Sequence, residues 1–262
     1  MNPAEVLALY DRTMRRDAAA PEATRVIAEP VVRLLEHAER RGMIVHATIS
    51  EGDADEIVAR EAAHFTDLGY RLEWKHFSHD MPADLPARLA ARGFVPEAPE
   101  TFLVLELARA PVSLLAPLAH EVRRFTDPDE LAALLPAFAE QWDGEADRVG
   151  RRLLTALRAH PDQLSVHVAI VEGEPASIGW IDFSPGKPFS GLWGGETRAA
   201  FRRRGLYTAL VASRVQEARD RGVGYLTIDA LPTSRPIVER HGFVALAVTT
   251  PYILASRAAQ IP

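Results

Sequence analysis

One turn constrains the fold of this chain more than any other feature. The run 201–207 reads Phe-Arg-Arg-Arg-Gly-Leu-Tyr. It follows a short apolar and aromatic run over 189–197, which predicts a strand. It precedes a predicted helix, because the apolar side chains over 206–217 recur at helical spacing. Gly205 would let backbone N–H groups approach an anion, and the helix N-terminus adds free donors and the positive end of its dipole. We therefore interpret the turn as a pyrophosphate site; the alternative is a solvated, Arg-rich start of a helix.

The segments after the turn follow a definite order. Glycines end the helix near 220–224, and alternating residues predict a strand over 225–230. A short helix is predicted over 234–241, with Ser234 as its N-cap, and Gly242-Phe243 closes it before a final apolar run. Strand, anion-binding turn, helix, strand, short helix and Gly-Phe thus occur in sequence.

This order and the turn itself resemble the GCN5-related N-acetyltransferase (GNAT) superfamily over residues 120–255. The acyl-CoA loop of that family has the pattern Arg or Gln, two residues, Gly, one residue, then Gly or Ala. Arg202 and Gly205 match it, whereas Tyr207 stands where the family usually has a small residue. The resemblance implies an α+β fold with a mixed, mostly antiparallel sheet flanked by helices, and acetyl-CoA as co-substrate. It places the cofactor against Gly195, Thr197, Arg202, Arg203, Arg204, Gly205, Leu206 and Tyr207.

The first half of the chain repeats the order of the second. Gly69-Tyr70 precedes an alternating strand, as Gly224-Tyr225 does, and Gly93-Phe94 follows a short helix, as Gly242-Phe243 does. Self-similarity of this kind indicates two copies of one fold in tandem.

We predict two GNAT-like domains, at 1–110 and 119–262, joined by a Pro-containing linker. The copies differ where the cofactor would bind, because residues 50–56 of the first copy carry four acidic side chains in place of the arginines. Carboxylates there suit a helix N-terminus but would repel a pyrophosphate. The first domain is therefore predicted to be a degenerate copy without a cofactor loop.

Composition excludes several classes of protein. The chain has no cysteine, which excludes disulfides, thiolate nucleophiles and Cys-ligated metals. A net charge of −6 argues against an extended nucleic-acid surface, and no apolar run approaches the length that spans a membrane. His76, His79 and Asp80 are interpreted as surface residues, and no metal is expected. We expect a cytoplasmic enzyme, as a monomer or homodimer, with no membrane or nucleic-acid partner.

The resemblance implies direct acyl transfer, in which a neutral amine attacks the thioester and CoA leaves. Such a step needs a base for the amine and an acid or solvent for the thiolate. Glu196, at the end of the strand before the loop, is the predicted base, with Asp182 second. The usual acid of the family, a Tyr, falls on Val238 here, so Tyr252, Tyr207 or water must serve.

Aromatic residues and a carboxylate suggest where the acceptor binds. Trp142 and Asp143 separate two predicted helices, one over 128–140 with a break near Pro136 and one over 146–160, in a region that lies beside the acceptor in this family. The alternative roles are a core position for Trp142 and a helix cap for Asp143. Trp193 is a further predicted substrate contact.

Three functions fit these observations. The first is an acetyl-CoA-dependent N-acetyltransferase acting on a primary amine of a small molecule or peptide. The second is an acyltransferase like mycothiol synthase, whose family also joins two GNAT halves. The third is a non-catalytic acyl-CoA-binding regulatory module, which the missing Tyr makes conceivable.

Overall fold

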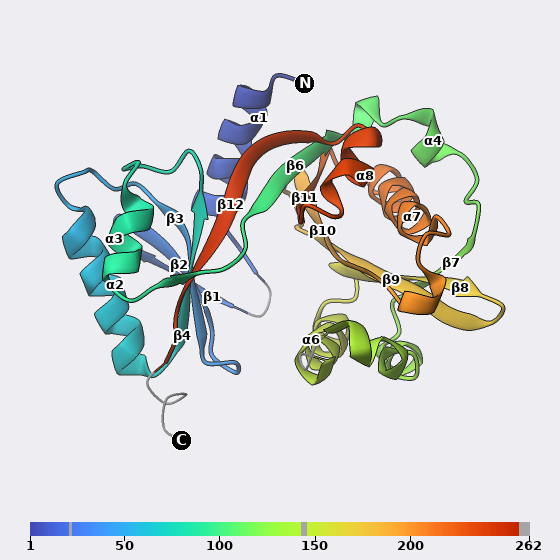
Figure 1. The fold of residues 1–262 in the computed structure, drawn as a ribbon, viewed down its shortest axis with the longest axis horizontal. Helices are drawn as coiled ribbons and strands as arrows, with labels where there is room; N and C mark the ends of the chain where they lie inside the picture. Colours follow the sequence, from blue (N-terminus) through green and yellow to red (C-terminus); the bar gives the residue numbers. More distant parts are fainter. Residues whose placement is uncertain (21–22, 143–145, 257–262) are drawn as a thin grey trace. The chain divides into compact units, whose positions relative to one another are not determined.

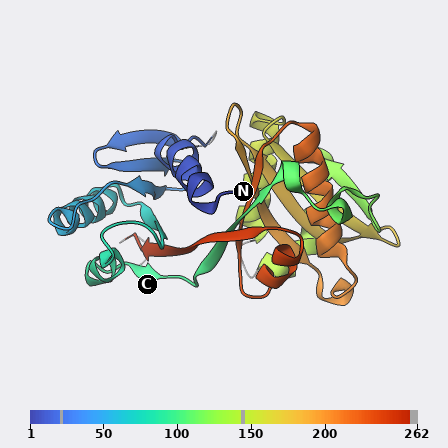
Figure 2. The same ribbon diagram turned by 90° about the horizontal axis from the view of Figure 1, so that it is seen from above.

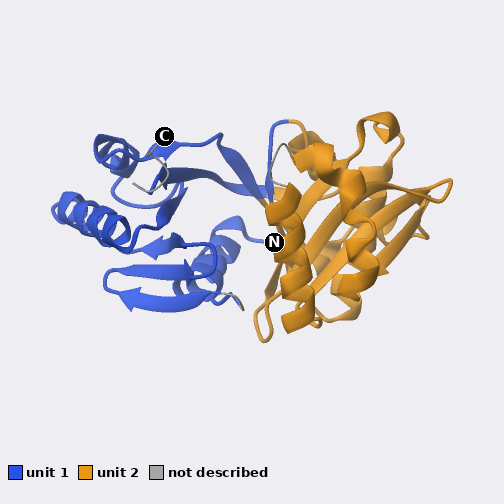
Figure 3. Ribbon diagram, turned by 90° about the horizontal axis from the view of Figure 1, so that it is seen from below, with its two compact units in different colours: residues 1–102, 229–232, 245–262 blue, residues 103–228, 233–244 orange. Residues whose placement is uncertain are grey.

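The computed structural model describes residues 1–20, 23–142 and 146–256, which form two compact units (Figure 3). Unit 1 comprises residues 1–102, 229–232 and 245–262, and unit 2 comprises residues 103–228 and 233–244. The chain therefore passes between the units more than once, and β12 (Val244–Leu254) lies almost wholly in unit 1. The tandem division at 1–110 and 119–262 stays a prediction.

The sheet of unit 1 is mixed. Its neighbouring strands are antiparallel except for one parallel pair, β3 with β4. In spatial order they are β1 (Thr24–Ala28), β2 (Val31–Glu36), β3 (Arg41–Ala47), β4 (Arg71–Phe77) and β12, with β5 (Val95–Pro96) also paired to β12. Helices α2 (Ala54–Leu68) and α3 (Leu85–Ala91) lie together on one face of these strands (Figure 1).

Helix α2 packs so closely on β3 that one position must be glycine. A Cβ atom on Gly42 would lie 1.9 Å from Cε1 of Phe65, whose ring is fully buried. Beside it, Arg33 donates to Glu61 through Nε and Nη2 at 2.6 and 2.8 Å, so the buried carboxylate is paired. The apolar face of α2 thus closes the core of unit 1.

The N-terminal segment covers the end of unit 1 where β3 and β4 separate. These strands pair only over Arg41–Ile44 and Arg71–Trp74. Helix α1 (Pro3–Tyr10) and the π-helical turn η1 (Asp11–Arg16) bring Arg15 there, and its Nε donates to the Val45 carbonyl at 3.0 Å. The same guanidinium donates to both carboxylate oxygens of Asp80, at 2.8 and 2.7 Å. The carbonyl that β4 leaves unpaired therefore has a partner from the chain itself.

The strands from β7 to β11 form the part of the sheet that lies in unit 2, and among their printed pairs only β10 with β11 is parallel. Its strands in spatial order are β7 (Glu121–Phe125), β8 (Leu164–Val171), β9 (Glu174–Phe183), β10 (Phe189–Thr197) and β11 (Tyr225–Ala230). The strand β6 (Glu100–Glu106) runs from unit 1 into unit 2.

Helices cover both faces of the unit 2 sheet. Figure 1 shows α6 (Ala146–Ala159) and α7 (Leu206–Asp220) on opposite faces, and Figure 2 shows α7 lying across the strands. The remaining helices are shorter: η2 (Leu107–Arg109), α4 (Val112–Leu115), α5 (Pro128–Ala132), η3 (Leu135–Trp142), η4 (Ala199–Phe201) and α8 (Arg235–Arg240). The predicted α+β class, with mixed and mostly antiparallel sheets flanked by helices, is confirmed.

The structure differs from the sequence analysis in two respects. The break predicted near Pro136 falls a few residues earlier, because α5 ends at Ala132 and a 3-10 helix starts at Leu135. Sequence analysis also missed β1 to β3, whose residues alternate too weakly to stand out.

A buried network of hydrogen bonds connects α7 to β8. His167 lies 2.7 Å from Glu217 through Nε2 and 2.8 Å from the Ser213 hydroxyl through Nδ1. The Ser165 hydroxyl and Arg221 donate to Glu217 at 2.8 and 2.6 Å. Burial raises the pKa of Glu217, but the hydrogen bonds from His167 and Ser165 outweigh it and lower that pKa to about 2.

This network predicts acid-sensitive stability. Because the pKa of Glu217 is lower in the folded chain than its ordinary 4.5, its stabilisation is complete above pH 4.5 and is lost as the pH falls toward about 2. Glu217→Gln should therefore lower the urea midpoint at neutral pH and flatten its fall below about pH 4.5. Tryptophan fluorescence can follow unfolding.

The exposed Glu140 provides the matched control. Glu140→Gln should keep the wild-type dependence of the midpoint on pH. The interpretation is wrong if Glu217→Gln and the wild type lose stability in parallel down to the lowest pH measured.

Candidate functional site

The site of unit 2 is made by two strands that separate. β10 and β11 pair in parallel over Phe189–Gly191 and Tyr225–Thr227, and β10 then runs on to Thr197 without following β11. On its other side β10 stays paired with β9, through a bulge between Trp193 and Glu196. The edge of β10 that turns away from β11 thus offers main-chain groups to a ligand.

Two glycines at the bulge allow close approach. Gly194 has φ +59°, and a Cβ there would lie 1.8 Å from the Trp180 ring. A Cβ on Gly195 would lie 2.4 Å from Cε2 of Tyr207. Both positions therefore exclude any side chain, as expected for a bulge with close packing on it.

The turn before α7 has the backbone of an anion site. Gly205 occupies the N-cap with φ +80°, and Arg203 has φ +62°. The N–H groups of the first turn of α7 have no acceptor within the helix. Arg202, Arg203 and Arg204 are exposed around them, and Nε of Arg202 donates to the Thr197 carbonyl at 3.1 Å. Free donors and positive charge meet at one helix start.

The corresponding turn of unit 1 has the opposite charge. Asp53 is the N-cap of α2 and accepts a 2.5 Å hydrogen bond from the Ser50 hydroxyl, and Asp55 and Glu56 follow in the first turn. These carboxylates already interact with the dipole of α2. The absence of a cofactor site in unit 1 stays a prediction.

The ring of Tyr207 lies on β10. Its ring lies against Gly195, and its hydroxyl is hydrogen-bonded to Ser234. Ser234 was predicted to cap α8, but its side chain makes no cap hydrogen bond. The departure from the family pattern at Tyr207 is therefore accommodated by a glycine on the facing strand.

Glu196 is the candidate base on β10. It follows the bulge on β10, opposite Ile178, and is half-buried. Burial raises its pKa, and the positive charge of Arg202 partly opposes that rise. Asp182, the second candidate, sits farther back on β9 opposite Gly191, 3.9 Å from Arg152.

Sequence analysis missed one residue that supports the site. Arg214 is 1% exposed on the sheet-facing side of α7, and its Nη1 donates to the carbonyls of Trp180 and Trp193, each at 3.1 Å. Burial lowers its pKa to about 10. Its signal in the sequence is an arginine one helical turn after Leu210, on the apolar stripe.

The other predicted residues are distributed as follows. Leu206 is buried, so only its backbone faces the loop, and the Thr197 hydroxyl lies 2.7 Å from that of Ser177. Trp193 is 39% exposed, and its indole folds over Gly191.

Three predictions concern residues outside this cluster. Trp142 packs on Phe138 in the core of unit 2, so an acceptor contact stays a prediction. Asp143 lies outside the described residues. Tyr252 belongs to unit 1, whose core holds its ring, and not to unit 2.

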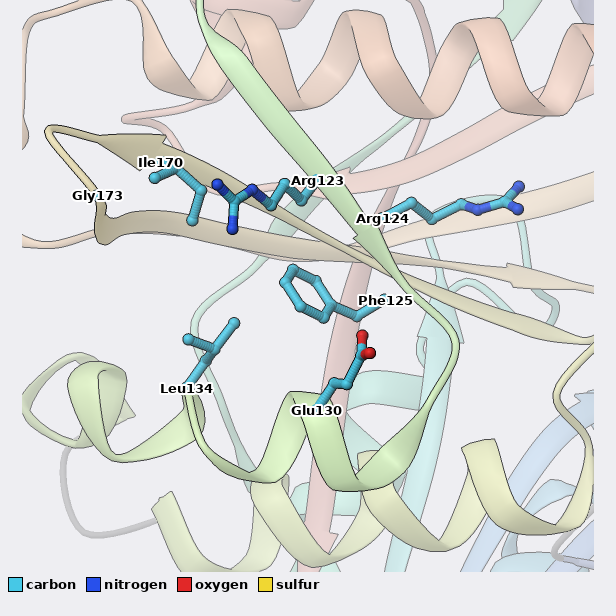
Figure 4. Close-up of a pocket in the computed structure, with 7 residues that line it drawn as sticks. All are labelled: Arg123, Arg124, Phe125, Glu130, Leu134, Ile170 and Gly173. Atoms are coloured by element: carbon cyan, nitrogen blue, oxygen red, sulfur yellow. The ribbon is translucent and has the colours of Figure 1, made fainter.

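A separate hollow of about 650 Å³ lies on unit 2 between β7, α5 and the β8–β9 hairpin (Figure 4). Its lining residues are Arg123, Arg124, Phe125, Glu130, Leu134, Ile170 and Gly173. Arg124 is already paired with Glu217 at 3.0 Å. None of the predicted site residues lines it.

Within the described ranges, no helix is both long and apolar enough to cross a membrane. The same part of the chain contains no group of three or more His, Cys, Asp or Glu side chains placed to hold a metal ion.

Comparison with known proteins agrees with this geometry. Residues 113–234 match the family model described as an acetyltransferase (GNAT) domain. No curated protein sequence matches the chain.

Solved structures share the fold over nearly the whole chain. A GCN5-related N-acetyltransferase from Kribbella flavida superposes with a TM-score of 0.70 at 15% identity, covering 96% of this chain and 95% of the other. A tandem GNAT protein from the clavulanic acid biosynthesis pathway gives 0.60 at 15% identity, with 97% and 95% covered. A GCN5-related N-acetyltransferase from Sphaerobacter thermophilus gives 0.58 at 13% identity, with 96% and 84% covered.

The separated strands, the arginine-rich turn before α7 and the matched family model all fall in the same stretch of unit 2. Residues 113–234 therefore belong to the GNAT superfamily, and the chain as a whole has the GNAT fold.

Proposed function

We propose that unit 2 binds acetyl-CoA and transfers its acetyl group to a primary amine of a small molecule or peptide. The observation that carries this proposal is the juxtaposition of three features of one unit: the free edge of β10, the N-terminus of α7 and the carboxylate of Glu196. Each suits a different part of the reaction.

The residues present fit this co-substrate. The pyrophosphate is bound by the N–H groups of Arg203 to Tyr207 and by the exposed guanidinium groups of the same turn. The amide-containing arm pairs with the main chain of β10 beyond Gly191, as an added strand would. At 194 and 195 glycine makes room for the rings of Trp180 and Tyr207 against the same strand.

Glu196 acts as the base. Deprotonation of the acceptor amine needs a carboxylate whose pKa is not far below the working pH, and burial moves the pKa of Glu196 in that direction. Its half-buried position still allows a water molecule to pass the proton.

Unit 1 serves as a structural partner with no acyl-CoA site of its own. The turn before α2 is acidic, and Arg15 already occupies the carbonyl of Val45 at the open end of β3. In unit 1 the charge of the turn is thus reversed, and the open strand edge is blocked.

One observation favours a second candidate. Val238, at the position of the usual acid of the family, is fully buried, which would suit a module that binds acyl-CoA without turning it over. Release of CoA thiol across a panel of amines separates the two functions, whereas CoA binding alone does not.

The first test concerns the anion-binding turn. Gly205→Val should weaken acetyl-CoA binding by about tenfold or more, because φ +80° strains a β-branched residue and the side chain enters the phosphate space. Calorimetry of the wild type should give one site per chain.

Gly173→Val is the matched control, since Gly173 has φ +84° and open space around its Cβ position. It should share the backbone strain and keep wild-type affinity. Two equivalent sites per chain, or equal losses in both variants, would contradict the assignment.

The second test concerns Glu196. Glu196→Gln should lower kcat by roughly ten- to a thousandfold and leave the acetyl-CoA Kd nearly unchanged. In the wild type, kcat/KM should fall as the pH falls through the raised pKa of Glu196, since only the ionised carboxylate accepts a proton.

In Glu196→Gln that acid limb should disappear. Glu174→Gln, which changes an exposed carboxylate on β9, should behave as the wild type. An unaltered pH–rate profile with full turnover in Glu196→Gln would eliminate the role.

A further inference from the structure

The strands of the two units correspond one to one, except at one edge. In each unit a long helix joins two parallel strands: β3, α2 and β4 in unit 1 correspond to β10, α7 and β11 in unit 2. Antiparallel pairing then continues outward, from β3 to β2 and β1, and from β10 to β9 and β8. By this correspondence β1 takes the place of β8.

The strand β8 has a neighbour on both sides, whereas β1 has one. The outer edge of β8 pairs with β7, Val166–Ile170 against Glu121–Phe125. The strand β1 begins the spatial order of the sheet, and among the described residues no strand lies beyond it. Backbone N–H and C=O groups along that edge are therefore open to a further strand. A strand added there would stand in unit 1 where β7 stands in unit 2.

The side chains of β1 do not protect its edge. The strand β7, at the other end of the spatial order, has charged side chains at three of its five positions, Glu121, Arg123 and Arg124. Charges of this kind on an edge strand oppose pairing with another molecule. The sequence of β1 is Thr-Arg-Val-Ile-Ala, with a single charge, and its Ile27 is 55% exposed. An open edge with β-branched, apolar residues favours pairing.

Both faces of β1 offer apolar surface to a neighbouring strand. Val26 and Ala28 pack against the core beneath α2 and remain partly exposed. On the other face, Ile27 lies opposite Val32, and the partly exposed Leu34 lies in the same small apolar cluster as Val32. A strand paired with β1 would extend the apolar surface on each face.

The occupant that fits this edge is β1 of a second copy of the chain. An edge strand that pairs antiparallel with itself does so about a two-fold axis, so the same patch serves both copies. Centred on Val26, such pairing sets Arg25 opposite the second copy's Ile27. No like charges are then directly opposed, and the aliphatic part of the arginine can cover the isoleucine. The same operation on β7, centred on Arg123, would set two arginines opposite each other.

We propose that the chain forms a two-fold homodimer in which the β1 strands of two copies pair antiparallel, with Val26 at the axis. The interface contains no residue of the proposed acyl-CoA site and does not rest on the proposed function. Because a five-residue strand with its neighbours buries less surface than a permanent interface, we expect a Kd of about 1–100 µM.

Sedimentation velocity of the full-length chain tests the dimer. The wild type should pass from monomer to twice the monomer mass as its concentration crosses the expected Kd. Ile27→Lys should raise that Kd about tenfold or more, because it sets a lysine opposite Arg25 twice in each dimer. Val112→Lys is the matched control, since Val112 is 81% exposed on α4 of unit 2. It makes the same change of residue and should keep the wild-type Kd.

The absence of cysteine allows the register to be tested separately. Directly opposed residues of antiparallel strands have Cα atoms about 4.5–5.5 Å apart, which a disulfide can bridge. Val26→Cys should therefore give a disulfide-linked dimer on mild oxidation. Thr24→Cys is the control on the same strand, because the proposed register sets it opposite the second copy's Ala28 and far from its own equivalent. It should stay unlinked.

The outcomes decide the matter. A wild type that stays monomeric well above the expected Kd range overturns the proposal. So does a dimer whose Kd is equally affected, or equally unaffected, by Ile27→Lys and Val112→Lys, since its interface would lie elsewhere. Cross-linking through Thr24→Cys and not through Val26→Cys would overturn the proposed register and, with it, the two-fold pairing centred on Val26.

Discussion

The site of unit 2 depends on how one strand edge is kept open. Separating β10 from β11 leaves main-chain groups without ladder partners, and a buried carbonyl left unpaired costs about 1–3 kcal/mol. Arg214 offsets part of this free-energy cost, because its guanidinium donates hydrogen bonds to the carbonyls of Trp180 and Trp193 at the bulge. The outer edge of β10 stays available as a result. The glycines at 194 and 195, the buried arginine and the raised pKa of Glu196 all follow from this one departure from regular pairing.

Unit 1 meets the same constraint in a different way, and the difference explains why the two units are not equivalent. There β3 leaves β4 after Ile44, and the arginine comes from the N-terminal segment, so that Arg15 occupies the carbonyl of Val45 from the open side. Asp11 and Asp80 neutralise Arg15 at 2.7 Å each. The arrangement is closed and paired in charge. In unit 2 the arginine comes from α7, and within the described residues no carboxylate forms an ion pair with it. The arrangement around Arg15 in unit 1 is suited to stability. The arrangement around Arg214 in unit 2 leaves the edge of β10 and the charge of the arginine available.

Much of this could be predicted from the sequence. The strands over 189–197 and 225–230 and the helix that begins at 206 and ends near 220 carry strong periodic and glycine signals, and the structure has them at the predicted bounds. The position at which a helix ends was harder to predict. The helix α5 ends at Ala132, before Pro136, because local turns decide where a helix ends. Arg214 was missed for a physical reason, since periodicity places it on the apolar stripe but cannot show which carbonyls lie within its reach. The helix cap expected from Ser234 is also absent, because its side chain is hydrogen-bonded to the hydroxyl of Tyr207 and not to the backbone of α8.

The pairing of Tyr207 with Gly195 shows how a departure from a family pattern can be absorbed. A large residue at the third position of the loop needs space, and the structure supplies it on the facing strand, where any Cβ would collide with the ring at 2.4 Å. The sizes of these two residues are therefore coupled: a side chain at 195 is excluded while Tyr207 is present. Removing the ring would take away the three atoms nearest to the Cβ position of Gly195, and with them the ionisable group whose charge raises the pKa of Arg214. Gly195, Tyr207 and Arg214 are therefore coupled, and a substitution at one of them changes the surroundings of the other two.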